Sequence, residues 1–346
     1  MRIDGQPNQP ACRTPVRGGE VVETQNVLGT REVDLLAATD FLFPQGIDHH
    51  RLLAGVRGIA PIVSGFARRV AGLGRLPDAA LRVQPAERLD VPLLIVGGGS
   101  SGLEAAARFG SRATLADDGL ALGGSLGALD PPRAETLVRQ ARSAGAHLFE
   151  RTSALSLSRE PEDGSGRWTA LLVGPERTRV VRATAVLLAT GCHDAVPEFP
   201  NNDLPGIFSA RAALVAWRSD VLVGRRIALV GNGPYVRKLH EELQGAVEVL
   251  PLDAESVVQA IGRERLTGLW VTSELGRRRL KLDALAFDGP GAPSFELAVQ
   301  AGANVDFSAK SGYVPRADAE GRVAPGVFVA PEPVAEAFAA LEQALS

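Results

Sequence analysis

The chain has 346 residues, of which 45% are apolar and 22% charged, and its formal net charge is −3. This length allows about two domains, and the composition is typical of a globular protein. Two cysteines cannot build a disulfide framework, a four-thiolate zinc site or an iron–sulfur cluster, so no metal site is expected. The slightly acidic charge gives no basic field for nucleic acid. Without an apolar leader or a run of about 18 apolar residues, we expect a soluble, cytoplasmic protein with no membrane span.

The first 30 residues predict turns and short extended pieces, and helical spacing of apolar residues follows from Asp34 to Leu76. The polar stretch from Pro77 to Asp90 predicts a connector. Beyond it, short apolar strands alternate with helices, which is typical of parallel sheets covered on both faces. The expected elements are helices at 101–109 and 334–345 and strands at 92–96, 113–116, 185–189, 226–230, 247–250, 269–272, 284–287 and 326–330.

A complete G-x-G-x-x-G motif follows the first of these strands directly and opens an Ala-rich helix. In such a motif Gly97 permits the tight turn, and Gly99 lets the backbone approach a pyrophosphate. Gly102 lets the helix pack closely on the strand. The free amides and dipole of the helix N-terminus would face the phosphates. The motif therefore predicts a dinucleotide site.

An acid and two segments of small residues accompany this loop. Asp117 lies about 20 residues after Gly97, where a carboxylate would accept hydrogen bonds from a ribose, and Asp118 is the competing candidate. The segment 123–126 follows the second strand and would approach the ribityl or pyrophosphate part of a flavin. The segment 188–191 ends a buried strand with small residues, where the chain must pass close to a dinucleotide.

A second strand followed by a glycine pair, Gly231 and Gly233, occurs about one domain length later. This loop is incomplete because Val236 stands where the third small residue belongs. The strand that follows has its nearest acid at Asp253. Two interpretations stay open: a second dinucleotide site, or a structural remnant of one.

Two other chemistries are less favoured. Ser100 and Ser125 each sit in a G-x-S-x-G sequence, but a serine hydrolase needs several strands before its nucleophile, and residues 1–90 predict helices and loops. Cys192 has no second cysteine at redox spacing, so we interpret it as a small buried residue after a strand. No residue is predicted as catalytic.

The order of these segments resembles that of two-dinucleotide flavoproteins. More narrowly, it is similar to the α subunits of FAD-dependent amine and amino-acid dehydrogenases, namely heterotetrameric sarcosine oxidase, hydroxyproline and proline dehydrogenases, opine oxidases and hydrogen cyanide synthase. The segment 69–77 is similar to the link before their first nucleotide strand, and residues 2–25 look like the tail of their plant-type [2Fe–2S] domain. The segments that carry the resemblance are 97–102, 123–126, 189–191, 202–207 and 231–234.

The resemblance implies an α/β fold with a two-dinucleotide flavoprotein-like Rossmann domain, an inserted smaller nucleotide-binding domain and an N-terminal helical extension. The expected division is a [2Fe–2S] ferredoxin-like remnant at 1–30, the helical extension and linker at 31–90, an FAD-binding domain at 91–206 plus 282–346, and an NAD-binding-like insertion at 207–281.

The resemblance also implies which residues hold the cofactors. FAD is expected in the first site, and NAD or another adenine nucleotide is one interpretation of the inserted domain, where Gly231 and Gly233 would bind it. The residues expected to line the FAD are Gly97, Gly99, Ser101, Gly102, Asp117, Gly124, Ser125, Thr190 and Gly191, with Glu332 as the acid of the closing segment.

Two departures from the family pattern affect these expectations. Cys12 matches only the last ligand of the iron–sulfur cluster, so the other three would lie in a small [2Fe–2S] subunit or before a truncated start. Pro331 and Pro333 flank Glu332 and remove backbone donors near the phosphates.

The predicted function is therefore the α-type subunit of an FAD-dependent amino-acid or amine dehydrogenase or oxidase of the sarcosine, proline, hydroxyproline or opine class. It would pass hydride or electrons between the flavin and a partner subunit or NAD, next to an FAD-binding β subunit that oxidises the amine. The alternative is a catalytically inactive nucleotide-binding scaffold for such a β subunit.

Overall fold

The computed structural model describes residues 85–346, apart from 160–165, 275 and 332, together with scattered residues among the first 35. The chain divides into two units, residues 1–84 and 85–346. In the first unit, β1 (Arg2–Ile3) pairs antiparallel with β2 (Val22–Glu23). Cys12 and, apart from Leu35, the helical segment predicted between Asp34 and Leu76 lie outside the described residues.

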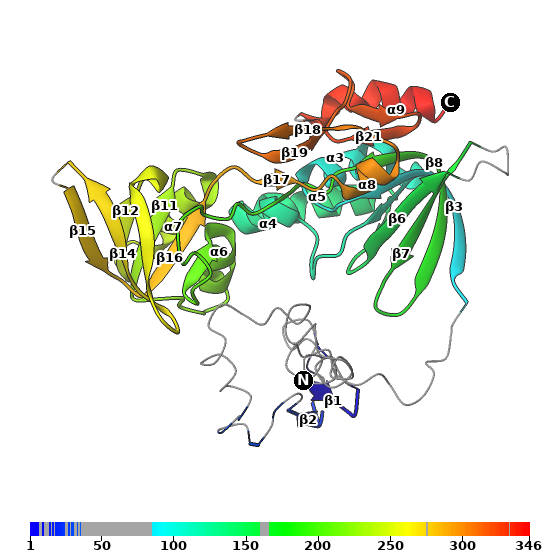
Figure 1. Cartoon of the computed structure of the whole chain (residues 1–346). Coiled ribbons are helices and arrows are strands. Elements are labelled where there is room, and N and C mark those ends of the chain that lie inside the picture. Colours follow the sequence, from blue (N-terminus) through cyan, green and yellow to red (C-terminus); the bar gives the residue numbers. More distant parts are fainter. Residues whose placement is uncertain are drawn as a thin grey trace, which may run out of the picture. The chain divides into compact units, whose positions relative to one another are not determined.

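The second unit contains an eight-stranded sheet in the order β20-β21-β8-β3-β4-β5, and β7 and then β6 continue it beside β8 (Figure 1). The five strands β21, β8, β3, β4 and β5 run parallel, whereas β6, β7 and β20 are antiparallel to their neighbours. Their bounds are β3 (Glu87–Val96), β4 (Ala113–Ala116), β5 (His147–Phe149), β6 (Ser153–Arg159), β7 (Trp168–Val173), β8 (Thr178–Leu188), β20 (Arg322–Ala324) and β21 (Val327–Val329).

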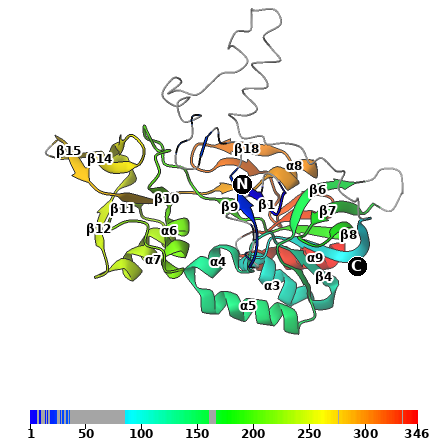
Figure 2. The same ribbon diagram turned by 90° about the horizontal axis from the view of Figure 1, so that it is seen from below.

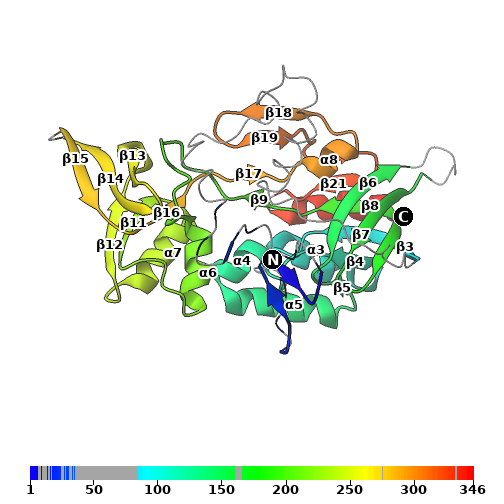
Figure 3. The same cartoon turned by 60° about the horizontal axis from the view of Figure 1, so that its bottom comes forward.

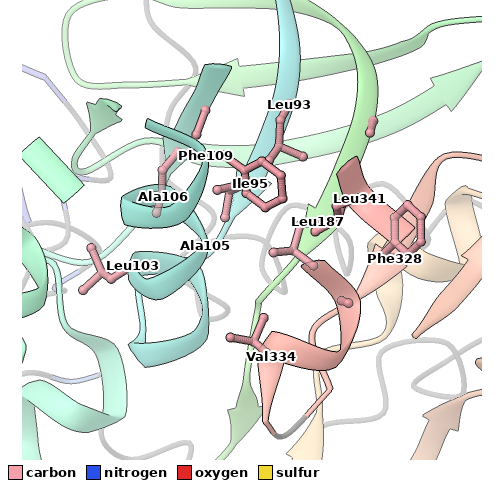
Figure 4. Packing of buried hydrophobic residues seen from close by; sticks show 14 of the residues in the cluster. Leu93, Ile95, Leu103, Ala105, Ala106, Phe109, Leu187, Phe328, Val334 and Leu341 are labelled. Atoms are coloured by element: carbon pink, nitrogen blue, oxygen red, sulfur yellow. The ribbon is translucent and has the colours of Figure 1, made fainter. Parts of the chain in front are cut away.

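Helices cover one face of this sheet, and Figure 2 shows α3 and α5 side by side there. The core beneath them joins Ile95 of β3, Leu103 of α3 and Leu187 of β8 with Phe328 and Leu341 (Figure 4). Strands β6 and β7 and helix α8 pack on the opposite face. The helices are α3 (Ser100–Phe109), α4 (Gly124–Leu129), α5 (Pro131–Ser143), α8 (Glu296–Gln300) and α9 (Phe338–Ala344).

A second, four-stranded parallel sheet has the order β10-β16-β11-β12. Helices α6 and α7 pack on one of its faces and the antiparallel sheet β13-β14-β15 packs on the other (Figure 3). The bounds are β10 (Ile207–Ser209), α6 (Ala210–Arg218), β11 (Arg226–Gly231), α7 (Pro234–Leu243), β12 (Glu248–Leu252), β13 (Val257–Gly262), β14 (Leu266–Ser273), β15 (Gly276–Lys281) and β16 (Ala284–Asp288).

Short elements complete the described chain. Strand β9 pairs with β17, and β18 with β19 makes an antiparallel hairpin. Three single turns of 3₁₀-helix also occur. These elements are β9 (Cys192–His193), β17 (Ala292–Pro293), β18 (Val305–Ser308), β19 (Gly312–Pro315), η3 (Gly110–Arg112), η4 (Ala254–Ser256) and η5 (Val334–Ala337).

Three differences from the sequence prediction concern where elements and sheets begin or end. The connector expected up to Asp90 ends earlier, because β3 starts at Glu87 and pairs with the first half of β8. The C-terminal helix expected at 334–345 begins as a 3₁₀ turn, η5. Strand β16 pairs with β10 and β11, so the sheet of the inserted domain extends beyond the boundary expected at 281.

Candidate functional site

The first glycine loop joins β3 to α3 and is packed so tightly that two positions exclude a side chain. Gly97 has φ of +108°, and a Cβ on it would collide with the carbonyl oxygen of Ala189 on the neighbouring strand's extension. A Cβ on Gly102 would collide with the carbonyl oxygen of Gly97. The motif therefore brings α3 onto the strand ends, as glycines at these positions predict.

Gly99 is different, because a Cβ placed on it would meet no atom within 4 Å. It is the N-cap residue of α3, and no side-chain cap serves that helix terminus. The first amides of α3 therefore have no side-chain cap from the N-cap residue, and the space at the Cβ position of that residue is open. The helix dipole favours an anion there.

The second glycine segment packs directly on the first loop. The amide of Gly123 donates to the carbonyl oxygen of Gly98 at 2.8 Å. Gly124 has φ of +50°, and its Cβ would lie 3.1 Å from Cα of Gly99. The two segments thus pack backbone against backbone, and the side of Gly99 away from Gly124 stays open.

The acid at the end of β4 faces this surface. Oδ2 of Asp117 accepts from the amide of Gly98 at 2.6 Å, and Oδ1 accepts from the amide of Gly119 at 2.9 Å. These bonds select Asp117 over Asp118 as the acid that contacts the glycine loop. An ionised carboxylate has about four acceptor positions, so two remain for hydroxyl donors.

A cavity of about 540 Å³ opens beside the loop. Thr190 contributes to its wall, and its hydroxyl donates to the carbonyl oxygen of Ser294 at 3.0 Å. Gly191, with φ of +67°, accepts from the amide of Ser294 through its own carbonyl oxygen at 3.0 Å. Other wall residues are Val96, Gly97, Ala116, Asp117, Asp118, Thr152, Cys192, His193 and Arg211.

Ser125 lies apart from this cavity. It belongs to α4 and lines a smaller cavity of about 190 Å³ with Tyr235 of α7. Burial raises the pKa of the Tyr235 phenol above its usual value, although a hydrogen bond with the Ser125 side chain and the charge of Arg211 act to lower it. The phenol is therefore protonated at neutral pH and can donate a hydrogen bond.

The second glycine loop has a feature that the sequence prediction missed. A Cβ on Gly231, with φ of +98°, would collide with the carbonyl oxygen of Asp288. The carboxylate of Asp288 accepts from the amides of Tyr235 at 2.8 Å and Val236 at 3.1 Å. The only sequence signal was an acid directly after a predicted strand, since the neighbour of that strand cannot be read from the sequence.

Several further predictions concern single residues. Ser101 lies in the first turn of α3, as expected, while Glu332 and Cys12 are outside the described residues. The prediction that Cys192 is buried is wrong, because the parallel strand β8 ends at Leu188 and Cys192 is exposed in the short strand β9. Within the described residues, no group of three His, Cys, Asp or Glu side chains could hold a metal ion. No helix among the described residues is long and apolar enough to cross a membrane.

Two curated proteins are similar in sequence. Hydrogen cyanide synthase subunit HcnB of Pseudomonas aeruginosa is 29% identical over 215 residues, which cover 57% of this chain and 44% of HcnB. Sarcosine oxidase subunit alpha of Corynebacterium sp. is 31% identical over 260 residues, which cover 68% of this chain and 27% of that subunit. The chain therefore matches less than half the length of either relative. No family model matches.

Solved structures extend the similarity to the fold. L-proline dehydrogenase from P. horikoshii has a TM-score of 0.63 and 25% identity, and the match covers 74% of this chain and 53% of that one. Thioredoxin reductase from T. acidophilum has a TM-score of 0.52 at 16% identity, covering 74% and 94%. These matches confirm the two-dinucleotide flavoprotein-like α/β fold and the resemblance to subunits of amine and amino-acid dehydrogenases.

Proposed function

We propose that this chain binds FAD at the first glycine loop and acts as the α-type subunit of an amine or amino-acid dehydrogenase or oxidase. The observation that carries the proposal is the cradle around Gly99, where open space, uncapped helix amides and a facing carboxylate occur together. A dinucleotide needs these three features for its pyrophosphate and its adjacent ribose.

The other described residues predicted to bind FAD lie at or near the same loop. Gly97, Gly102 and Gly124 make the close backbone approach, and Thr190 lines the neighbouring cavity, with Gly191 next to it in the chain. Ser101 contributes an amide in the first turn of α3. Bound FAD would supply the acceptor of a hydride or electron pair, and this chain would orient it and shield it from water.

The relatives suggest the substrate class that we propose, namely amines and amino acids. Sarcosine, proline, hydroxyproline and opines are secondary amines, and oxidation of such an amine to an imine transfers a hydride from the carbon beside the nitrogen to a flavin, while the nitrogen releases a proton. An FAD-binding β subunit would oxidise the amine, with a small [2Fe–2S] subunit as a further partner. NAD is not proposed as a ligand of the inserted domain, because the carboxylate of Asp288 lies at the glycine loop of that domain.

The test is Gly99→Val. Since a Cβ at this position meets no protein atom within 4 Å, the variant should fold, yet its side chain would fill the space that the pyrophosphate needs. We expect purified native protein to carry flavin absorbance at about 450 nm and the variant to lose at least about 90% of it.

Gly127→Val is the matched control, because a Cβ on Gly127 also meets no atom within 4 Å and the position lies in α4. It should keep its flavin. Full flavin occupancy in Gly99→Val would contradict the proposed site. A colourless native protein, in a complex that still oxidises its amine, would instead support the scaffold alternative, which the proline pair at 331 and 333 favours.

A further inference from the structure

A carboxylate contacts each of the two glycine loops, but at different positions. At the first loop, Asp117 contacts Gly98 and leaves the N-terminus of α3 open. At the second loop, the carboxylate of Asp288 sits on the N-terminus of α7 itself and takes the amides of Tyr235 and Val236. These amides are the donors that a dinucleotide pyrophosphate would use in a Rossmann unit.

The carboxylate of Asp288 also occupies the space that the loop glycine leaves free. A Cβ on Gly233 would collide with Cγ and both carboxylate oxygens of Asp288, whereas one on Gly99 meets nothing. Pro234, at the first position of α7, has no amide hydrogen to offer. The loop therefore lacks both the room and the donors for a phosphate.

From this contrast we infer that Asp288 is an internal ligand that closes the second glycine loop, so that the inserted domain excludes NAD and other adenine nucleotides. The carboxylate takes the place of the phosphate: it is an anion at the positive end of a helix dipole, held by two amides. A dinucleotide would have to displace it and would meet its negative charge at short range.

The closure has a consequence for the direction of electron transfer. The amide of Tyr235 is fixed by Asp288, and the phenol of the same residue hydrogen-bonds with Ser125 in α4. The closed loop thus anchors a side chain that contacts the first domain. With the loop closed, no pyridine nucleotide is held there as an electron acceptor.

The experiment measures binding of ADP and of NAD⁺ to the FAD-loaded full chain by isothermal titration calorimetry. Native protein should give no binding tighter than about 1 mM, and Asp288→Ala should bind ADP at least about tenfold more tightly than native protein. Asp288→Asn retains the volume and removes the charge, so it separates steric from electrostatic exclusion and also serves if Asp288→Ala fails to fold.

Asp283→Asn is the matched control. Asp283 lies just before the start of β16, and its carboxylate likewise accepts two backbone amides, those of Arg225 and Arg226. It should leave ADP binding as weak as in native protein. Sub-millimolar ADP or NAD⁺ binding by native protein would overturn the inference, as would folded Asp288→Ala and Asp288→Asn variants that bind no better than native protein.

The result is independent of the proposed FAD site. Flavin occupancy is read from absorbance in the same samples, so a missing flavin and an open second loop are separate outcomes. If the native chain carries no flavin, the titration is repeated in the Gly99→Val background, where the first loop is blocked. Any nucleotide binding that remains then belongs to the second loop.

Discussion

Arg218, the last residue of α6, links α6 to α7 and to α4. Its guanidinium makes a bidentate ion pair with Glu242 of α7, and one Nη donates to the carbonyl oxygen of Ala128 at 2.5 Å. Both charged side chains are about three-quarters buried, at 25% and 23% exposed. Hydrogen bonding from Arg218 lowers the pKa of the Glu242 carboxyl.

This shift predicts a pH-dependent contribution to stability. Because the pKa of Glu242 is lower in the folded state, the contribution is present above the ordinary value of 4.5 and is lost as pH falls through the folded value. Glu242→Gln should reduce the free energy of unfolding by about 1 kcal/mol near pH 7. Urea denaturation at several pH values should show the difference from native protein shrinking towards acid.

Glu241→Gln is the control for this measurement. Glu241 is the neighbouring acid of α7, it pairs with Lys238 at 3.2 Å, and its side chain is 66% exposed. Such a surface pair contributes little, so its substitution should change the unfolding free energy by less than about 0.5 kcal/mol. Equal losses in the two variants would contradict the role given to Glu242.

At the scale of elements, the helices differ in how their N-termini are capped. Helix α6 starts after Ser209, whose hydroxyl oxygen accepts from the amide of Ala212 at 3.1 Å, and α5 starts after Asp130, which caps it in the same way. Helices α3 and α7 begin after glycines and have no cap of their own. The two helices at the glycine loops are thus left to be completed by another acceptor.

Ser209→Ala tests the cap of α6. Loss of this hydrogen bond should reduce the free energy of unfolding by about 1 kcal/mol, and Ser209→Asp should retain most of it. Ser219→Ala, at the other end of the same helix, removes only a hydroxyl that donates to the carbonyl oxygen of Val215 and should be nearly neutral. Chemical denaturation of the three variants measures the comparison, and equal effects at both ends would refute the cap.

At the scale of the whole molecule, the proposed FAD site lies in a unit whose core is continuous across β3, α3, β8 and β21 (Figure 4). A ligand that binds only the folded state stabilises the entire cooperative unit. Adding FAD at about 100 times its Kd should raise the free energy of unfolding of residues 85–346 by about 2.7 kcal/mol. Thermal unfolding followed by circular dichroism should show a higher Tm, and the same rise in Gly99→Val would count against the site.

Much of the fold can be predicted from the sequence, because buried parallel strands are apolar runs followed by glycines. The strand at 113–116 is confirmed at its expected bounds, and the helix after the first loop to within one residue. The antiparallel strands β6 and β7 are not among the predicted elements, although the alternation in β6 is itself a strand pattern. The first half of β3 is also not predicted as a strand, because it contains charged residues. One of them, Glu87, accepts a hydrogen bond from Arg179 of the neighbouring strand β8.

Part of the candidate site can likewise be predicted from local sequence, and part cannot. Gly97, Gly102 and Asp117 act within about 20 residues of one another, so spacing alone identifies them. Asp288 lies more than 50 residues from Tyr235, and their contact depends on β16 lying next to β11. Sheet order is a long-range property that no local pattern encodes, and it decides whether a glycine loop is open or closed.

The contact between the two glycine segments of the first site also limits how the chain can evolve. Gly124 is so near Gly99 that a methyl group on the former would press on the backbone of the latter. Gly123 is in turn held to Gly98 through its amide. Substitutions in these segments, about 25 residues apart in the sequence, should therefore have non-additive effects on stability, because a change in one is tolerated only if the other accommodates it.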